Sequence, residues 1–167
     1  MEMAARLAAV SGRREAMKAG TKIAGGVIAA AVSLVATYEG RSLVAYLDPV
    51  GIPTICEGYT LGVRLGDVAT PEACDVLTRI EVVKALGVVD KSVSRPLPDG
   101  ARVALTSFVY NVGAGAYRDS TLLRLLRAGD IRGACNQLPR WVYAKGKRLK
   151  GLERRREAER KICLSGL

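Results

Sequence analysis

The sequence of this 167-residue chain predicts an α+β protein in which a small β-hairpin precedes a mainly helical part. Strand-like residues run from Ser42 to Leu47 and again from Ile52 to Tyr59, on either side of a turn motif. From Thr70 onward the chain instead shows helix starts, helical spacing of apolar residues and breaker-rich connections. A chain of this length forms one domain, here with two lobes, and can bury a substantial core.

Charge and composition narrow the possible functions. Lys and Arg outnumber Asp and Glu by 26 to 16, and the net charge of +10 favours a polyanionic partner: nucleic acid, anionic lipid or a negatively charged cell wall. The chain has no histidine, so acid–base chemistry near neutral pH would fall to a carboxylate or, less often, to Lys, Tyr or Cys. The four cysteines lack Cys-x-x-Cys spacing, so we expect neither a metal site nor a cofactor.

The chain begins with a basic segment, residues 1–22, followed by an uncharged run from Ile23 to Thr37. This order is typical of a secretory signal or a membrane anchor. As a helix the run would span about 23 Å, less than the roughly 30 Å hydrocarbon core of a bilayer. Three interpretations follow: a weak anchor that inserts and later leaves the membrane, a signal peptide cleaved near residues 29–31, and a buried helix in a cytosolic protein.

The hairpin segment holds the candidate catalytic residues. Residues 48–51 (Asp-Pro-Val-Gly) form a turn motif, with Pro second and Gly fourth. The hairpin would therefore bring Asp48 and Thr54 near each other, with Glu39 at its base. Two carboxyl groups suit glycosidic hydrolysis, in which one protonates the leaving oxygen and the other activates water or attacks the sugar. Asp in a turn and Thr in a strand are, however, also favoured for purely structural reasons.

Helices are predicted for most of the remaining chain. Residues 70–72 (Thr-Pro-Glu) start a long helix, with Thr as N-cap and Pro at the first position, which runs to about Val89. A breaker-rich linker over residues 94–100 follows. The only tryptophan, Trp141, is expected to pack in the core. Shorter helices are expected at residues 101–112, 119–128, 130–138 and 152–164, with a loop at 111–115 between the first two.

The most basic stretch runs from Lys145 to Lys161 and contains nine Lys or Arg residues. Such a run supports a nucleic-acid-binding helix more than any other feature of the chain does. Three glutamates interleave with the cations, however, and Arg155–Glu159 and Glu157–Lys161 fall at helical ion-pair spacing. No base-reading motif accompanies the run. We interpret it as a solvated helix face that also attracts an anionic wall polymer.

The segment from Glu39 to Thr60 resembles the signature of the phage-type lysozymes (endolysins) of glycoside hydrolase family 24. That signature is Glu, eight residues, Asp or Cys, five residues and Thr, followed by a segment like Gly-His-Thr. Glu39, Asp48 and Thr54 match the spacing, and residues 58–60 read Gly-Tyr-Thr. Within the family, the chain resembles the lambdoid-phage endolysins that carry a signal-anchor-release segment. Further segments that carry the resemblance are 108–115, 120–123, 140–141 and 151–155.

The resemblance implies a lysozyme-like fold and an enzyme that hydrolyses peptidoglycan for host lysis. The bond would be the β-1,4 linkage between N-acetylmuramic acid and N-acetylglucosamine, cleaved with inversion. Glu39 would be the general acid, Asp48 would activate or orient water or stabilise positive charge on the sugar, and Thr54 would position that water. The implied divisions are a basic N-terminus with the signal-anchor-release segment (1–38), a hairpin lobe (39–70), a linking helix (71–93) and a helical lobe (94–167).

The resemblance also implies where the protein acts. Residues 23–37 would hold an inactive form in the bacterial inner membrane, with the N-terminus inside and the C-terminus outside, and release would deliver an active monomer to the periplasm. While the run is anchored, Glu39 would be held at the bilayer surface, because it lies two residues beyond the run. The partner would be peptidoglycan and not nucleic acid. The loop with Asn111 and Gly113 would line the saccharide cleft.

An exported protein with four cysteines is expected to form disulfides. Of the three possible connectivities, we expect Cys56–Cys74 in the hairpin lobe and Cys135–Cys163 in the helical lobe, on the basis of the lobes that the resemblance implies. Two other functions remain open. A lytic transglycosylase would share substrate and fold but use one acid, and the second acid and hydroxyl of the hairpin argue against it. A non-catalytic basic module would bind wall or nucleic acid without turnover.

Overall fold

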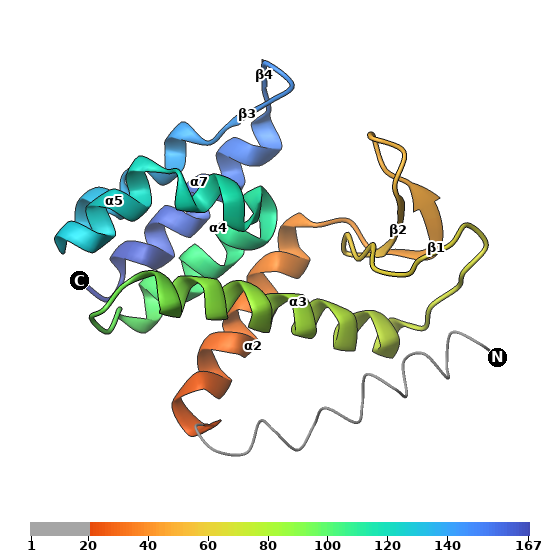
Figure 1. Cartoon of the computed structure of the whole chain (residues 1–167), viewed down its shortest axis with the longest axis horizontal. Coiled ribbons are helices and arrows are strands. Elements are labelled where there is room, and N and C mark those ends of the chain that lie inside the picture. The colour runs from red at the N-terminus through yellow and green to blue at the C-terminus, as the bar shows by residue number, and fades with distance from the viewer. Residues whose placement is uncertain (1–20) are drawn as a thin grey trace.

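The computed structural model describes residues 21–167, and the predictions for the basic N-terminal residues 1–20 lie outside this part (Figure 1). The fold is mixed and dominated by helices, with two small two-stranded sheets. The elements in chain order are α2 (Thr21–Tyr38), β1 (Ser42–Leu47), β2 (Pro53–Cys56), α3 (Pro71–Ser92), α4 (Asp99–Arg118), α5 (Thr121–Ala128), α6 (Ile131–Cys135), the 3₁₀ helix η2 (Leu138–Arg140), β3 (Tyr143–Ala144), β4 (Lys147–Arg148) and α7 (Lys150–Leu164).

The predicted hairpin is present, with a shorter second strand. β1 and β2 pair antiparallel with Tyr46 opposite Thr54, and the Gly51 N–H donates to the Asp48 carbonyl at 2.9 Å across the predicted turn. β2 ends at Cys56 rather than Tyr59 because Cys56 adopts a left-handed conformation, with φ of 58°. The chain then folds back on itself, and Tyr59 exchanges two backbone hydrogen bonds with the last part of β2.

The long helix α3 connects the hairpin region with the other helices, as Figure 1 shows. It begins as predicted: Thr70 is the N-cap, its hydroxyl accepts from the Ala73 N–H at 3.2 Å, and Pro71 occupies the first turn. The helix continues to Ser92, three residues beyond the predicted end.

Helix α4 lies at the centre of the main core, which also includes residues from α3, α5, α6 and α7. Trp141 is partly buried and meets Phe108 edge-on, with ring centroids 5.1 Å apart, so its predicted packing role is confirmed. The buried core residues are Ala85, Val89, Leu97, Ala101, Ala104, Leu105, Phe108, Val109, Tyr117, Leu122, Leu123, Leu126, Ala134, Cys135, Leu138 and Cys163.

The helical lobe differs from the predictions at two places. The predicted loop over residues 111–115 is shorter in the structure: two helical segments of α4 meet at a kink, where only Gly113 leaves the helical conformation, with φ of 85° and ψ of 156°. The β3–β4 hairpin was not predicted at all. Its tip consists of two residues with positive φ, Lys145 at 49° and Gly146 at 74°. Two such residues form the tight turn that suits a two-residue hairpin.

The apolar run near the N-terminus forms helix α2, which packs against α3 and α4. Its buried residues Val27, Ala31 and Val35 belong to a second cluster with Val82 and Val103. In the folded structure the run is therefore a packed helix. No helix within residues 21–167 combines the length and the apolar character needed to cross a bilayer.

Candidate active site

Glu39 follows directly after α2, and helix α2 fixes its backbone. The Glu39 N–H donates to the Val35 carbonyl at 2.9 Å. Its carboxylate Oε1 accepts from Arg155 Nη1 of α7 at 2.6 Å and, weakly, from Asn111 Nδ2 of α4 at 3.5 Å. The Glu39 side chain is 25% exposed, while that of Arg155 is 3% exposed. One oxygen is thus held by the helices, and the group remains open to a ligand.

A buried ionic network stands behind Glu39. Arg155 also donates to Glu159 Oε1 at 3.0 Å and to the Ser107 carbonyl at 3.1 Å. Arg156 donates to the other Glu159 oxygen at 2.7 Å and to the Asn111 carboxamide oxygen. Burial lowers the pKa of Arg156, and the Glu159 carboxylate opposes that shift. Glu159 is fully buried and touches both arginines, so the network orients Arg155 toward Glu39.

The interpretation of the basic run as a solvated face is therefore wrong for part of α7. The Arg155–Glu159 pair exists, but it is buried instead of exposed. Glu157 contacts Arg160 at 3.4 Å and not Lys161. Helical spacing identified the first pair correctly and could not tell which side of the helix faces the core.

The side chains of Asp48 and Thr54 both form hydrogen bonds with the backbone of the hairpin. Asp48 Oδ1 accepts from the Val50 and Ile52 N–H groups, each at 2.9 Å. The Thr54 hydroxyl donates to the Ile52 carbonyl at 2.9 Å, and Thr54 is buried. Both side chains are thus fixed through the backbone of one residue, Ile52. Within residues 21–167, Asp48 Oδ2 receives no hydrogen bond, so this oxygen can accept one from a water.

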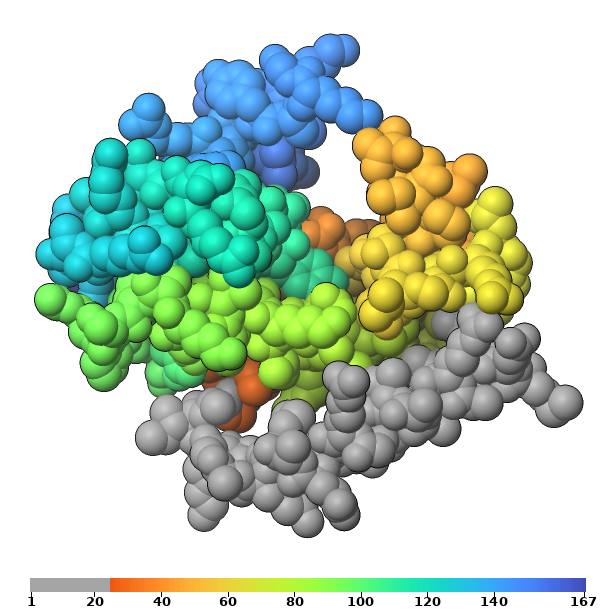
Figure 2. Space-filling model, in the orientation of Figure 1, coloured from red at the N-terminus to blue at the C-terminus, as the bar shows by residue number. Residues whose placement is uncertain are grey.

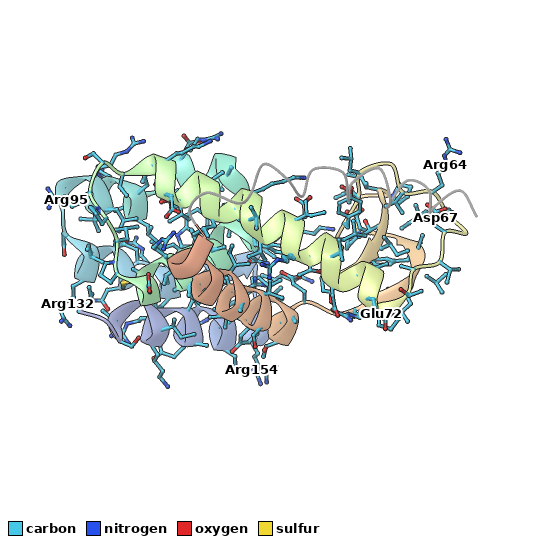
Figure 3. All side chains as sticks on the ribbon, turned by 90° about the horizontal axis from the view of Figure 1, so that it is seen from below. Arg64, Asp67, Glu72, Arg95, Arg132 and Arg154 are labelled. Atoms are coloured by element: carbon cyan, nitrogen blue, oxygen red, sulfur yellow. A yellow bond between two sulfur atoms is a disulfide. The ribbon has the colours of Figure 1, made fainter. Side chains whose placement is uncertain are left out.

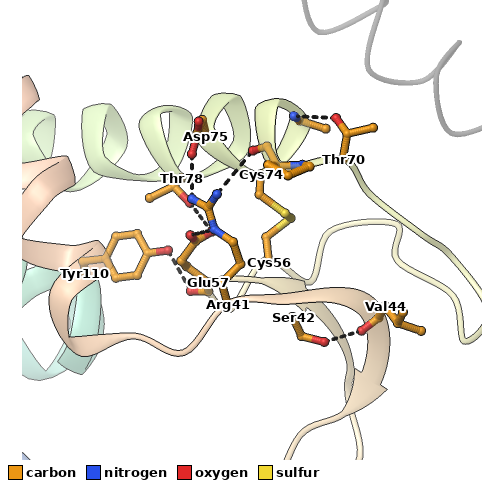
Figure 4. The surroundings of a disulfide bond; sticks show 12 residues. Arg41, Ser42, Val44, Cys56, Glu57, Thr70, Cys74, Asp75, Thr78 and Tyr110 are labelled. Atoms are coloured by element: carbon orange, nitrogen blue, oxygen red, sulfur yellow. Dashed lines mark hydrogen bonds and ion pairs between the residues drawn. A yellow bond between two sulfur atoms is a disulfide. The ribbon is translucent and has the colours of Figure 1, made fainter.

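A second ionic contact, missed by the sequence analysis, joins the hairpin to the helices (Figure 4). Arg41 donates to the buried Glu57 at 2.5 Å and to Asp75 of α3 at 2.6 Å. Hydrogen bonds to Asp75 and then to Glu57 raise the pKa of Arg41. The Thr78 hydroxyl donates to Glu57 Oε2 at 2.7 Å, and the Tyr110 hydroxyl donates to the Glu57 carbonyl at 2.9 Å. This contact fixes the end of β2 between α3 and α4.

The predicted disulfides are confirmed. Cys56–Cys74 ties β2 to α3 beside the Arg41–Glu57 contact (Figure 4). Cys135–Cys163 ties α6 to α7. Cys56, Glu57 and Cys74 have the composition of a metal site, but both sulfurs are bonded to each other, so no thiolate is available to a metal.

A groove of about 350 Å³ lies between the loop at residues 58–61 and the facing sides of α3 and α4. Gly113 and Tyr110 line it, whereas the Asn111 carboxamide lies between Glu39 and the arginines of α7. Burial, followed by the carboxylate of Glu39, raises the pKa of Tyr110, so its hydroxyl stays protonated as a donor. Helix α4 thus lines the groove with Tyr110 and Gly113 and contacts Glu39 through Asn111.

Comparison with known proteins identifies the family. The model of the phage lysozyme family matches residues 36–159. This chain belongs to the phage lysozyme family. The match runs from the end of α2 to the buried Glu159, and so includes every predicted catalytic residue.

Individual phage lysozyme relatives agree with this assignment. The SAR-endolysin of Enterobacteria phage PA-2 is 44% identical over 151 residues, which cover 86% of this chain and 92% of the relative. The muramidase domain of SpmX from Asticaccaulis excentricus has a TM-score of 0.76 and 31% identity, covering 81% of this chain and 95% of that one. The active form of the P1 phage endolysin has a TM-score of 0.75 and 28% identity, covering 82% and 84%. The lysozyme-like fold is thereby confirmed.

Proposed function

We propose that this phage lysozyme is an endolysin that hydrolyses the β-1,4 bond between N-acetylmuramic acid and N-acetylglucosamine in peptidoglycan and so lyses the host cell. The observation that carries the proposal is the partly exposed Glu39 carboxylate, held by Arg155 at 2.6 Å, together with a hairpin that fixes Asp48 and Thr54. Relatives described as SAR-endolysins and as a muramidase domain support the same substrate and reaction.

In this mechanism Glu39 gives its proton to the leaving glycosidic oxygen. Water forms the new bond to the sugar, Asp48 takes the proton that the water loses, and Thr54 orients the water. The Thr54 hydroxyl donates its proton to the Ile52 carbonyl, so the lone pairs of the Thr54 oxygen can accept a hydrogen bond from the water. Asp48 then releases its proton to solvent and Glu39 takes one from solvent, which restores both groups for the next cycle. Attack from the face opposite the leaving group inverts the configuration of the sugar.

The first test is the clearing of outer-membrane-permeabilised Gram-negative cells by the protein and by a Glu39→Gln variant. Loss of a general acid lowers rates by about 10²–10⁴-fold, and we expect a decrease in this range. Glu72→Gln, an exposed residue in the first turn of α3, is the matched control and should clear at the parent rate (Figure 3). Equal clearing by the Glu39 variant would place the activity elsewhere. Hydrolysis releases new reducing ends, whereas a transglycosylase would release none.

We also propose that residues 23–37 anchor an inactive form in the inner membrane, N-terminus inside, before the 39–167 domain acts in the periplasm as a monomer. The relatives described as SAR-endolysins support this step. When the run is in lipid, α2 cannot pack on Val82 and Val103, and Glu39 is not placed against Arg155. Full wall-degrading activity from a protein that fractionates with membranes would contradict the proposal.

A further inference from the structure

We infer that the β3–β4 hairpin and Lys150, the first residue of α7, form a substrate arm that binds the free carboxylates of the peptide stems of peptidoglycan, an inference that rests on the proposed function. Between Asp130 and Glu153 the chain carries six Lys or Arg residues and no Asp or Glu. Part of this segment forms the hairpin, whose residues 143–148 are all exposed. The hairpin therefore presents positive charge without an internal counter-charge.

The structure divides the basic run of the sequence into two parts with different environments. In α7, Arg155 and Arg156 are buried and neutralised by Glu159 and Glu39. In the hairpin and at the start of α7, the cations face solvent. Arg148 contacts Glu153, but the three exposed lysines there make no ion pair with any residue of the described 21–167. These lysines are Lys145, Lys147 and Lys150.

The backbone of the arm is fixed by a hydrogen bond at its base and by a tight turn at its tip. The Leu149 N–H donates to the carbonyl of the buried Val142 at 2.9 Å, which closes the base. The two positive-φ residues at the tip form a tight turn, so the lysines on either side of Gly146 keep their separation. A preorganised arm loses little backbone entropy when it binds a ligand.

A chain of hydrogen bonds places this arm next to the proposed acid. Arg156 donates to the Trp141 carbonyl at the base of the hairpin at 3.1 Å and also to Asn111, whose amide faces Glu39. In Figure 1 the β3–β4 and β1–β2 hairpins project to the same side of the molecule. Figure 2 shows the surface hollowed between residues near 145 and the β1–β2 tip. We take this hollow as the path of a polymer bound at Glu39.

The chemistry of the arm fits carboxylates on flexible peptides. Lysine ammonium groups are mobile point charges that accept anions from several directions, unlike the bidentate geometry of arginine. The glycan backbone is neutral where its acid groups are joined to peptide, so the anionic groups of the polymer lie on the stems that branch from it. Tyr143, 62% exposed at the start of the arm, offers an apolar face and a hydroxyl to the same peptide.

The experiment measures co-sedimentation with purified sacculi, using full-length Glu39→Gln protein as the parent so that the wall stays intact. The arm variant adds Lys145→Ala, Lys147→Ala and Lys150→Ala. The control variant adds Arg95→Ala, Arg132→Ala and Lys161→Ala, which remove the same charge from exposed residues without an ion pair in the described structure. Arg95 and Arg132 lie at the end of the molecule away from the β1–β2 region (Figure 3). Each protein is tested on native sacculi and on sacculi whose carboxylates have been amidated.

We expect the arm variant to bind native sacculi about tenfold more weakly than the parent, because three solvent-exposed charge contacts are lost. Amidation should weaken the parent by a similar factor and leave the arm variant unchanged, since both changes remove the same contacts. The control variant should stay within about twofold of the parent. Raising the salt concentration should reduce the difference between parent and arm variant.

Three results would overturn the inference. Equal losses by the arm and control variants would mean that only net charge matters. An arm variant that still responds to amidation as the parent does would place the carboxylate contacts elsewhere. Parent binding to duplex DNA as tight as to sacculi, with the same loss in the arm variant, would make the hairpin a general polyanion surface. The proposed function is tested separately, because it fails only if the unaltered protein, which retains Glu39, does not clear cells.

Discussion

The two parts of this phage lysozyme that meet at the site are stabilised in different ways. The hairpin region has a cluster of only six buried residues, and it leaves large side chains such as Val44, Leu47 and Val50 exposed. The main helical core has sixteen buried residues. The helices therefore have a large apolar core in addition to a disulfide, whereas the hairpin region, with its small core, relies more on the Cys56–Cys74 disulfide and the Arg41–Glu57 contact.

The same difference applies to the proposed catalytic groups. Asp48 and Thr54 are fixed by hydrogen bonds to Ile52, within four residues in sequence. Glu39 is fixed by Arg155, which lies 116 residues away. Substitutions that disturb α7 should therefore displace Glu39 first. Substitutions near the Cys56–Cys74 disulfide should disturb the hairpin first. The four predictions below test this difference.

The largest expected effect comes from Glu159→Ala. This change leaves Arg155 and Arg156 buried without their shared counter-charge, and removal of one partner from a buried ionic group costs about 3–5 kcal/mol. Denaturant unfolding measures the loss, and cell clearing should fall with it because Arg155 no longer has a fixed position. Glu157→Ala, on the same helix but partly exposed, should change stability by less than about 0.5 kcal/mol. Equal effects of the two changes would contradict the proposed network.

The second comparison removes each disulfide in turn. Chain entropy predicts losses of about 3.2 kcal/mol for the Cys56–Cys74 pair and about 3.6 kcal/mol for Cys135–Cys163. Their sequence separations, 18 and 28 residues, are similar enough to give nearly equal costs. Clearing activity, measured at a temperature where both double-alanine variants are folded, should fall more for Cys56→Ala/Cys74→Ala, because the hairpin region has the smaller core. A greater loss of activity in the other variant would reverse the comparison.

The third prediction concerns the break in α4. Gly113→Ala places a side chain at φ of 85° and ψ of 156°, a region that costs about 1–3 kcal/mol for residues other than Gly, although there is open space for the added carbon. Gly115→Ala, in helical conformation and also in open space, should instead stabilise by up to about 1 kcal/mol. Thermal unfolding of the two variants gives the sign of each effect. A stabilising Gly113→Ala would mean that the helix is not broken there.

The smallest expected effect is at the start of α3. Thr70→Ala removes the hydroxyl that accepts from the Ala73 N–H and should cost about 1 kcal/mol. Thr70→Ser keeps the hydroxyl and should remain close to the parent in denaturant unfolding. If both changes cost the same, the Thr70 methyl group rather than the cap would hold this end of the helix.

The sequence by itself determined features that depend on a few neighbouring residues. The turn at residues 48–51 and the Thr70 cap are confirmed, because each arises from contacts within three positions. The disulfide pairing was available from the resemblance to the family.

Only the tertiary structure decided the rest. Apolar composition is the same for a helix in a bilayer and a helix in a protein core, so only the packing of α2 against α3 and α4 shows its place in the folded enzyme. The β3–β4 hairpin has two residues in each strand, which is too short to show the alternation of apolar and polar residues that predicts a strand. Helical spacing is likewise the same for solvated and buried ion pairs. The contacts of Arg155 with Ser107 of α4 and with Glu39 decide that it faces inward, because neither partner belongs to its own helix and sequence spacing therefore cannot indicate them.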